Sequence, residues 1–164
     1  MKLNIKSIAK EVLIGAVILF VLSSTMSYIM KPNLDFNTVP NLEVELLNGS
    51  IYKRKTNKPL VIHFWAKWCR VCKLEIQNIE ELSKKYEVVT IAVNSGSNEE
   101  LKAYMNEKEL TFKVINDIDS KWSKLFKVEA FPTTFIYNSK EELKFTEVGY
   151  TTTAGLFARV AVLE

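Results

Sequence analysis

The sequence predicts an α/β domain with a mixed central sheet flanked by helices, preceded by one N-terminal transmembrane helix. Val12–Met30 is a run of 19 residues without a charge. Two nearly continuous apolar runs, Leu60–Trp65 and Val88–Val93, enclose a segment with helical spacing, which is typical of parallel strands joined by a helix. Thr133–Tyr137 and Lys144–Val148 are joined by a short polar turn, which predicts an antiparallel hairpin.

The net charge of +3 comes entirely from the N-terminal segment. Residues 1–31 hold four of the 22 Lys and Arg side chains and one of the 19 acidic ones, so the other 133 residues are neutral overall. A neutral domain offers no electrostatic surface for a polyanion, so no nucleic-acid partner is expected. The chain is 48% hydrophobic with few Gly and Pro, which excludes a disordered or fibrous protein.

The uncharged N-terminal run has the length of a membrane span. As a helix it would extend roughly 28 Å, close to the ~30 Å hydrocarbon core of a bilayer. Because lysines precede it, residues 1–31 are predicted to be a cytoplasmic lead and a transmembrane signal anchor. A cleavable signal peptide is the open alternative, with an apolar core over Val12–Leu22 followed by small residues, although no Ala-x-Ala site is present.

Both interpretations place the main domain outside the cytoplasm, in an oxidising compartment. The prediction is a single-pass protein of the inner (cytoplasmic) membrane whose main domain lies on the periplasmic side. Residues 32–41 are predicted to be a tether and residues 42–164 the folded domain.

The other predicted elements follow from local signals. A strand over 42–46 turns at Asn48-Gly49 and returns through 51–52. Lys53-Arg54-Lys55 is predicted to be a solvated loop, with contact to an anionic membrane surface as the alternative. The remaining elements are a helix from Cys72 to Tyr86, a capping-box helix from Ser97 to about Lys108, a strand over 112–115, a short helix capped by Asp119 or Ser120, and a closing helix from Thr151 to Val162.

Cys69-Arg70-Val71-Cys72 stands where the first buried strand turns into a helix. Unpaired N–H groups and the helix dipole stabilise a thiolate at this end, which lowers the pKa of the first cysteine. Cys69 is therefore predicted to be the exposed nucleophile and Cys72 the shielded resolving thiol. Arg70 adds a positive charge beside the thiolate.

The two cysteines also allow other interpretations. With His63 as the other soft ligand, four zinc ligands cannot be assembled without carboxylates, so no metal site is predicted. Covalent haem would need His after Cys72, where Lys73 stands. An inert disulfide closing so short a loop would stabilise the fold little. No cofactor is predicted. A Cu(I)-binding or copper-resistance protein using the same two sulfurs is the alternative function.

Three segments carry a family resemblance. Phe64-Trp65-Ala66-Lys67-Trp68-Cys69-Arg70-Val71-Cys72 resembles the active-site segment of the thioredoxin superfamily, Pro132 in Phe131-Pro132-Thr133-Thr134-Phe135 resembles its cis-proline, and Val148-Gly149 resembles its glycine loop. The resemblance implies a thioredoxin-like fold and a protein-disulfide oxidoreductase. It also implies that the backbone of Phe131, together with Pro132 and Gly149, binds the substrate chain.

The segment Cys72-Lys73-Leu74-Glu75, the Asn-Gly hairpin and the anchor are similar to the membrane-tethered TlpA-like branch, including its ScsD-like, copper-sensitivity-suppressor members. This resemblance implies protein thiol and disulfide substrates, and a membrane thiol-electron transporter as a partner. The predicted function is an extracytoplasmic thiol-disulfide oxidoreductase that acts as a reductase.

Besides Arg70, three residues are predicted to support the cysteines. His63 stands where thioredoxin has a buried aspartate that relays protons to the resolving cysteine, and a satisfied core histidine is the alternative. Glu75 matches a glutamate that tunes thiol pKa in relatives, and an exposed first-turn glutamate is the alternative. Trp68 is expected at the rim of the site, with Trp65 in the scaffold and Trp122 in the core.

Overall fold

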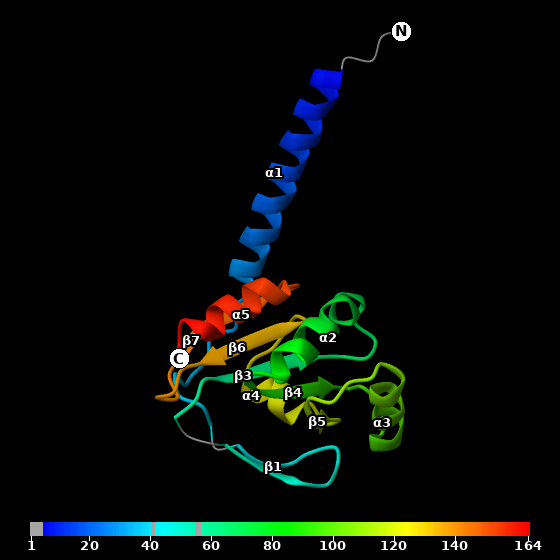
Figure 1. The fold of residues 1–164 in the computed structure, drawn as a ribbon, viewed down its shortest axis with the longest axis vertical. Coiled ribbons are helices and arrows are strands. Elements are labelled where there is room, and N and C mark those ends of the chain that lie inside the picture. The colour runs from blue at the N-terminus through cyan, green and yellow to red at the C-terminus, as the bar shows by residue number, and fades with distance from the viewer. Residues whose placement is uncertain (1–4, 41, 55–56) are drawn as a thin grey trace. The chain divides into compact units, whose positions relative to one another are not determined.

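The computed structural model describes residues 5–40, 42–54 and 57–164 (Figure 1). The chain divides into two compact units, Met1–Lys31 and Pro32–Glu164. The helices are α1 (Ile5–Ile29), α2 (Arg70–Ser83), α3 (Asn98–Glu107), α4 (Lys121–Leu125) and α5 (Thr153–Ala161), and the strands are β1 (Glu43–Glu45), β2 (Ile51–Lys53), β3 (Leu60–Trp65), β4 (Glu87–Val93), β5 (Lys113–Asp117), β6 (Thr133–Tyr137) and β7 (Leu143–Val148).

A mixed five-stranded sheet forms the centre of the second unit, in the order β5-β4-β3-β6-β7 (Figure 1). β3 pairs with β4 in parallel and with β6 in antiparallel orientation. β4 and β5 are parallel, and β6 and β7 form the predicted antiparallel hairpin. Every residue of β3 is buried, because helices or loops cover both faces of a central strand. The predicted mixed sheet flanked by helices is therefore confirmed.

Side chains alternate along the strands and form a core on each face of the sheet. On one face Val61 and Trp65 of β3 pack in a cluster with residues of α2, α3 and α5. On the other face Ile62 and Phe64 pack with Phe126, which follows α4, and with the small antiparallel β1–β2 hairpin. Cys69 and Cys72 lie where β3 ends and α2 begins.

Helix α1 covers most of the predicted anchor, residues 12–30. Within the described part of the chain, however, no helix combines the length and hydropathy needed to cross a membrane. The predicted transmembrane helix is therefore not confirmed. Residues 1–4 of the predicted lead lie outside the described residues.

Part of the predicted tether, residues 32–41, bonds to the domain. The amide of Val39 donates to the carbonyl of Glu141 at 3.0 Å, and the amide of Leu143 donates to the carbonyl of Asn37 at 2.8 Å. Residues 37–39 thus add to the edge of the β6–β7 hairpin and are not a free linker. Asn41 lies outside the described residues.

Two helix caps differ from the predicted ones. Ser120 is the N-cap of α4 but makes no side-chain cap, because its backbone is left-handed with φ 55°. The carboxylate of Asp117 instead accepts from the amides of Trp122 and Ser123, at 2.9 Å each. α5 is capped by Thr152, whose hydroxyl accepts from the amide of Gly155, one residue later than predicted. The predicted capping box of Ser97 and Glu100 is present.

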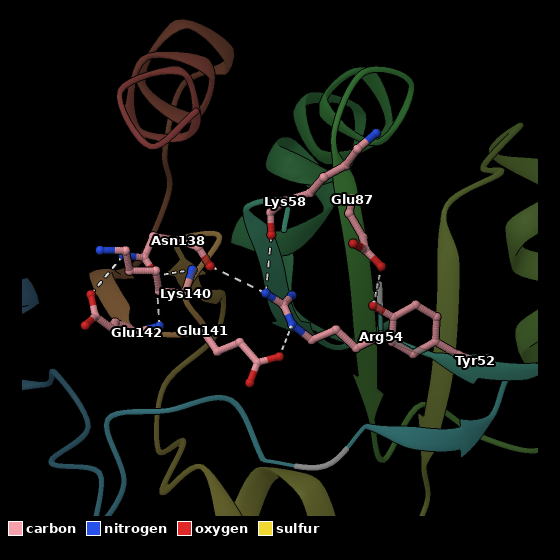
Figure 2. Close-up of polar contacts among 8 residues, drawn as sticks. All are labelled: Tyr52, Arg54, Lys58, Glu87, Asn138, Lys140, Glu141 and Glu142. Carbon is pink, nitrogen blue, oxygen red and sulfur yellow. Dashed lines mark hydrogen bonds and ion pairs between the residues drawn. The ribbon is translucent and has the colours of Figure 1, made fainter. Parts of the chain in front are cut away.

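Arg54 corrects the expectation of a solvated basic loop. Its side chain is 7% exposed and its Nε donates to the carboxylate of Glu141 at 3.1 Å (Figure 2). The same guanidinium donates to the carbonyls of Lys58 and Asn138. Arg54 therefore joins the β2–β3 loop to the β6–β7 turn and is not available to a membrane surface. Lys55 lies outside the described residues.

Candidate active site

Cys69 and Cys72 form a disulfide across the first turn of α2, with their Cα atoms 5.3 Å apart. Cys69 is the N-cap of the helix, and its Sγ accepts from the amide of Cys72 at 3.1 Å. This amide is one of the unpaired donors of a helix N-terminus, which would also stabilise a Cys69 thiolate after reduction. Cys69 is 8% exposed and Cys72 is fully buried. Cys69 is the more accessible of the two sulfurs, but in the disulfide it is not exposed as predicted.

The loop before β6 lies against the Cys69 sulfur. The Phe131–Pro132 peptide bond is cis, as predicted. The carbonyl oxygen of Phe131 is 3.6 Å from Sγ of Cys69. The amide of Gly149, whose φ is +90°, donates to the carbonyl of Pro132 at 2.8 Å. Three segments far apart in the sequence therefore meet at one end of the sheet, after β3, before β6 and after β7.

Trp68 directly precedes Cys69 and is 59% exposed. Its indole Nε1 donates to the carbonyl of Asn94 at 3.2 Å, and its ring meets the edge of Phe131 with centroids 5.6 Å apart. A groove of about 490 Å³ runs beside these two rings and is lined further by Ser120 and Lys124. Trp65 is 1% exposed and belongs to the scaffold.

Arg70 is the first residue of α2 and is exposed. Among the described residues its guanidinium has no ion-pair or hydrogen-bond partner. The charge therefore remains beside Cys69, where it favours an anion through space.

Glu75 is completely buried one turn after Cys72, so the alternative of an exposed first-turn glutamate is wrong. One carboxylate oxygen accepts from the amide of Thr151 at 2.8 Å, and the other has no partner among the described residues. Burial raises the pKa of Glu75 from 4.5 to about 7, although the Thr151 hydrogen bond opposes the rise. Glu75 thus joins α2 to the loop after Gly149 and titrates near neutral pH.

His63 is fully buried in the middle of β3. Its Nδ1 lies 2.9 Å from the Thr134 hydroxyl, while Nε2 has no partner in the described part of the chain. Burial lowers the pKa of His63 from 6.5 to about 3, so the imidazole is neutral at pH 7. The structure therefore does not show the fully satisfied core histidine of the alternative.

His63 belongs to a row of polar residues across the sheet. It is in register with Thr90 of β4 and Thr134 of β6, and residues in register share one face of a sheet. The Thr90 hydroxyl is buried and also lacks a partner among the described residues. The row lies on the same face as Val61 and Trp65, which pack in the cluster that contains Cys72.

Two contacts of the site were not expected from the sequence. The amide of Thr151 that holds Glu75 is 76 residues away in the chain, and no local pattern links them. Thr134 could have been suspected, since a hydroxyl within the apolar stretch after Pro132 requires a buried partner. As for metals, the described residues contain no group of three or more His, Cys, Asp or Glu side chains that could hold one.

Comparison with known proteins gives the same picture. Residues 33–146 match the AhpC/TSA family. A thioredoxin-like protein of Haemophilus influenzae is 24% identical over 166 aligned positions, covering 99% of this chain and 98% of that protein. The thioredoxin-like protein YneN of Bacillus subtilis is 30% identical over 119 positions, or 67% of this chain and 69% of its own. Sporulation thiol-disulfide oxidoreductase A of the same species is 29% identical over 96 positions, or 54% and 58%.

Solved structures share the fold. StoA of Bacillus subtilis superimposes with a TM-score of 0.61 at 21% identity, over 71% of this chain and 96% of that one. A secreted thiol-disulfide isomerase of Corynebacterium glutamicum gives a TM-score of 0.69 at 15% identity, over 76% and 84%. The match to residues 33–146, the cysteine pair at the start of α2 and these relatives lead to one conclusion: the chain belongs to the AhpC/TSA family and is a thioredoxin-type protein-disulfide oxidoreductase.

Proposed function

We propose that the protein is an extracytoplasmic disulfide reductase that works through Cys69-Arg70-Val71-Cys72. In the reduced protein the Cys69 thiolate attacks a disulfide of a substrate protein, forms a mixed disulfide and releases one substrate thiolate. The Cys72 thiolate then attacks Sγ of Cys69 and releases the second. Two electrons pass to the substrate, its thiolates take up two protons, and the Cys69–Cys72 disulfide remains.

The observation that carries this proposal is the position of the Cys69 sulfur. It lies at the start of α2 and 3.6 Å from the carbonyl oxygen of Phe131, before a cis-proline. We assign the backbone of Phe131, with Pro132 and Gly149, to the binding of the substrate chain, and Trp68 to the rim that it contacts. A substrate strand on this loop would bring its own sulfur to Cys69.

Glu75 supports the reducing direction. It lies three residues after Cys72 on α2, a spacing that makes helix side chains neighbours. A carboxylate that ionises near pH 7 raises the pKa of a nearby thiol. A less stable thiolate makes the reduced pair less stable, so the couple becomes a stronger reductant. Arg70 opposes this effect at Cys69, on the exposed side.

The two buried titratable groups suit different tasks. The pKa of Glu75, about 7, matches a group that accepts the Cys72 proton at neutral pH. The pKa of His63, about 3, makes its imidazole a weak base. We therefore assign proton acceptance to Glu75. His63 takes a positioning role in the Thr90–His63–Thr134 row under α2, in place of the predicted relay.

Placement outside the cytoplasm is supported by the N-terminal sequence. Lysines precede the 19 uncharged residues 12–30. The exposed large apolar side chains described in this stretch each have between 42% and 76% of their surface accessible to solvent. Exposed apolar surface of this extent requires a covering partner or lipid. We propose that this segment attaches the protein to the inner membrane. We also propose that a membrane thiol-electron transporter reduces the Cys69–Cys72 disulfide after each turnover.

The direction is tested by the reduction potential of the purified full-length protein and by thiol trapping in cells. We expect a potential below roughly −200 mV, a mostly reduced pair in vivo and turnover of insulin disulfides. A reduction potential of about −120 mV with a mostly oxidised pair would show an oxidant instead. Extraction of cell membranes at alkaline pH, which releases peripheral proteins, tests the attachment: the protein should remain with the membranes.

Replacing Glu75 with glutamine is expected to raise the reduction potential and to remove an inflection near pH 7 from the pH–rate profile of exchange. With the charge gone, Cys72 should hold about tenfold more thiolate at a given pH below its pKa. Glu81→Gln is the matched control, because it removes an equal charge from the exposed face of the same helix. Equal profiles for the two variants would contradict the role of Glu75.

A further inference from the structure

A second cavity lies at the end of the sheet away from the cysteines. Its volume is about 700 Å³, within the usual range of small-molecule sites. Lys58 and Pro59 line it just before β3 begins, whereas Cys69 follows the end of that strand. The end of α2, the start of β4 and the β1–β2 hairpin also line it. Three of the lining residues, Tyr52, Lys58 and Glu87, are labelled in Figure 2.

The lining of this cavity carries five lysines and two glutamates, although residues 32–164 are neutral overall. The acidic side chains in its wall are Glu87 and Glu164. Glu87 already accepts a hydrogen bond from the Tyr52 hydroxyl at 2.6 Å (Figure 2). The basic side chains in its wall are Lys53, Lys58, Lys84, Lys85 and Lys113.

Three of these lysines lack an acidic partner. Lys53 and Lys84 pair with carboxylates, Lys53 loosely with Glu43 at 3.7 Å and Lys84 with Glu81 at 2.6 Å. In the described part of the chain, Lys58, Lys85 and Lys113 make no ion pair. The nearby Glu141 cannot compensate them, because its carboxylate is taken by the buried Arg54 (Figure 2).

The aromatic rings of the wall are already covered. Nζ of Lys113 lies 5.6 Å from the ring centre of Tyr52, and Nζ of Lys85 lies 5.1 Å from that of Tyr86. These contacts hold the two ammonium groups over ring faces. They also leave those faces unavailable for stacking with a base or another planar ligand.

We propose that this cavity binds a small anion carrying several negative charges on phosphate groups. Unpaired ammonium groups around one concave space attract such an anion through point charges. The site is independent of the redox centre and does not rest on the reductase proposal. A soluble condensed phosphate and a phosphorylated headgroup share this chemistry, so the test uses a probe for each.

The test is titration calorimetry of the full-length protein with inorganic tripolyphosphate and, separately, with glycerol 3-phosphate. We expect saturable 1:1 binding of at least one probe that weakens as salt is raised. The variant Lys58→Gln/Lys85→Gln should bind about tenfold more weakly, since two ammonium contacts are lost. The control Lys102→Gln/Lys121→Gln removes the same charge outside the cavity and should bind as the wild type does.

The two probes separate the sources of the ligand. Tighter binding of tripolyphosphate would indicate a condensed phosphate, and tighter binding of glycerol 3-phosphate would indicate a headgroup. The proposal is overturned if neither probe binds saturably, or if the cavity variant and the control bind alike. Insulin reduction by the cavity variant should match the wild type, which shows that the variant is folded.

Discussion

Cys69→Ser is expected to lower the rate of insulin reduction by about a thousandfold or more. The thiolate is the nucleophile of exchange, and a serine hydroxyl at the same place is not ionised at neutral pH. The Cys69 sulfur is also the more accessible one, at 8% exposure against 0% for Cys72. Steady-state insulin turnover with a thiol reductant measures the loss.

Cys72→Ala is the matched variant, because it leaves the nucleophile and removes the resolving thiol. It should still attack substrate disulfides but remain bound to them through Cys69, as a mixed disulfide visible on a non-reducing gel. The order of roles would be reversed if Cys69→Ser accumulated the mixed disulfide and Cys72→Ala did not. Substrates trapped on Cys72→Ala can then be identified directly.

His63 is expected to make the fold sensitive to acid. Its pKa is 6.5 when unfolded and about 3 in the folded protein, so below pH 6.5 the unfolded chain binds a proton that the folded protein excludes. Above pH 6.5 His63 is neutral in both the folded and the unfolded chain, so its titration takes nothing from the free energy of unfolding. Stability is lost as pH falls towards 3, at up to about 1.4 kcal/mol per pH unit and roughly 5 kcal/mol in all.

The measurement is the free energy of unfolding in urea between pH 7 and 4.5, for wild type, His63→Val and His63→Gln. Relative to the wild type, both variants should become more stable as pH falls from 6.5 to 4.5, because neither replacement side chain titrates. In the wild type, Glu75 offsets the loss at His63 over this range. At pH 7 His63→Val should be less stable, since it leaves the Thr134 hydroxyl without its partner. Parallel curves for all three proteins would show that His63 does not carry the acid sensitivity.

Glu75 acts in the opposite direction. Its pKa is raised from 4.5 to about 7, so its contribution is complete below pH 4.5 and is lost as pH rises through 7. Together the two buried groups, one neutral base and one neutral acid, place the greatest stability of the oxidised protein in mildly acidic solution. Glu75 lies one turn after Cys72 on α2, and His63 lies on the face of the sheet whose core cluster contains Cys72. The free energy of unfolding therefore falls on either side of that pH range because of two groups around the redox centre.

Local chemistry was sufficient to predict most elements and the reactive pair. The apolar runs of β3 and β4 and the helical spacing after Cys72 predicted a parallel pair, because buried strands and amphipathic helices differ in period. Cysteines at the strand–helix junction predicted the redox centre, because a helix N-terminus stabilises a thiolate whatever surrounds it. The predicted capping residues Ser120 and Thr151 were wrong, because Asp117 and Thr152 supply the acceptors for α4 and α5.

What only the tertiary structure decided is the state of the polar side chains around that centre. Whether Glu75 is exposed or buried depends on α5 and the Thr151 loop, which meet α2 across 76 residues of chain. Whether the ring nitrogens of His63 find hydrogen-bond partners depends on the register of β3 with β4 and β6. The buried state of Arg54 depends on Glu141 in a distant turn. Sequence patterns report local period and charge, while desolvation and hydrogen bonding depend on contacts between distant segments.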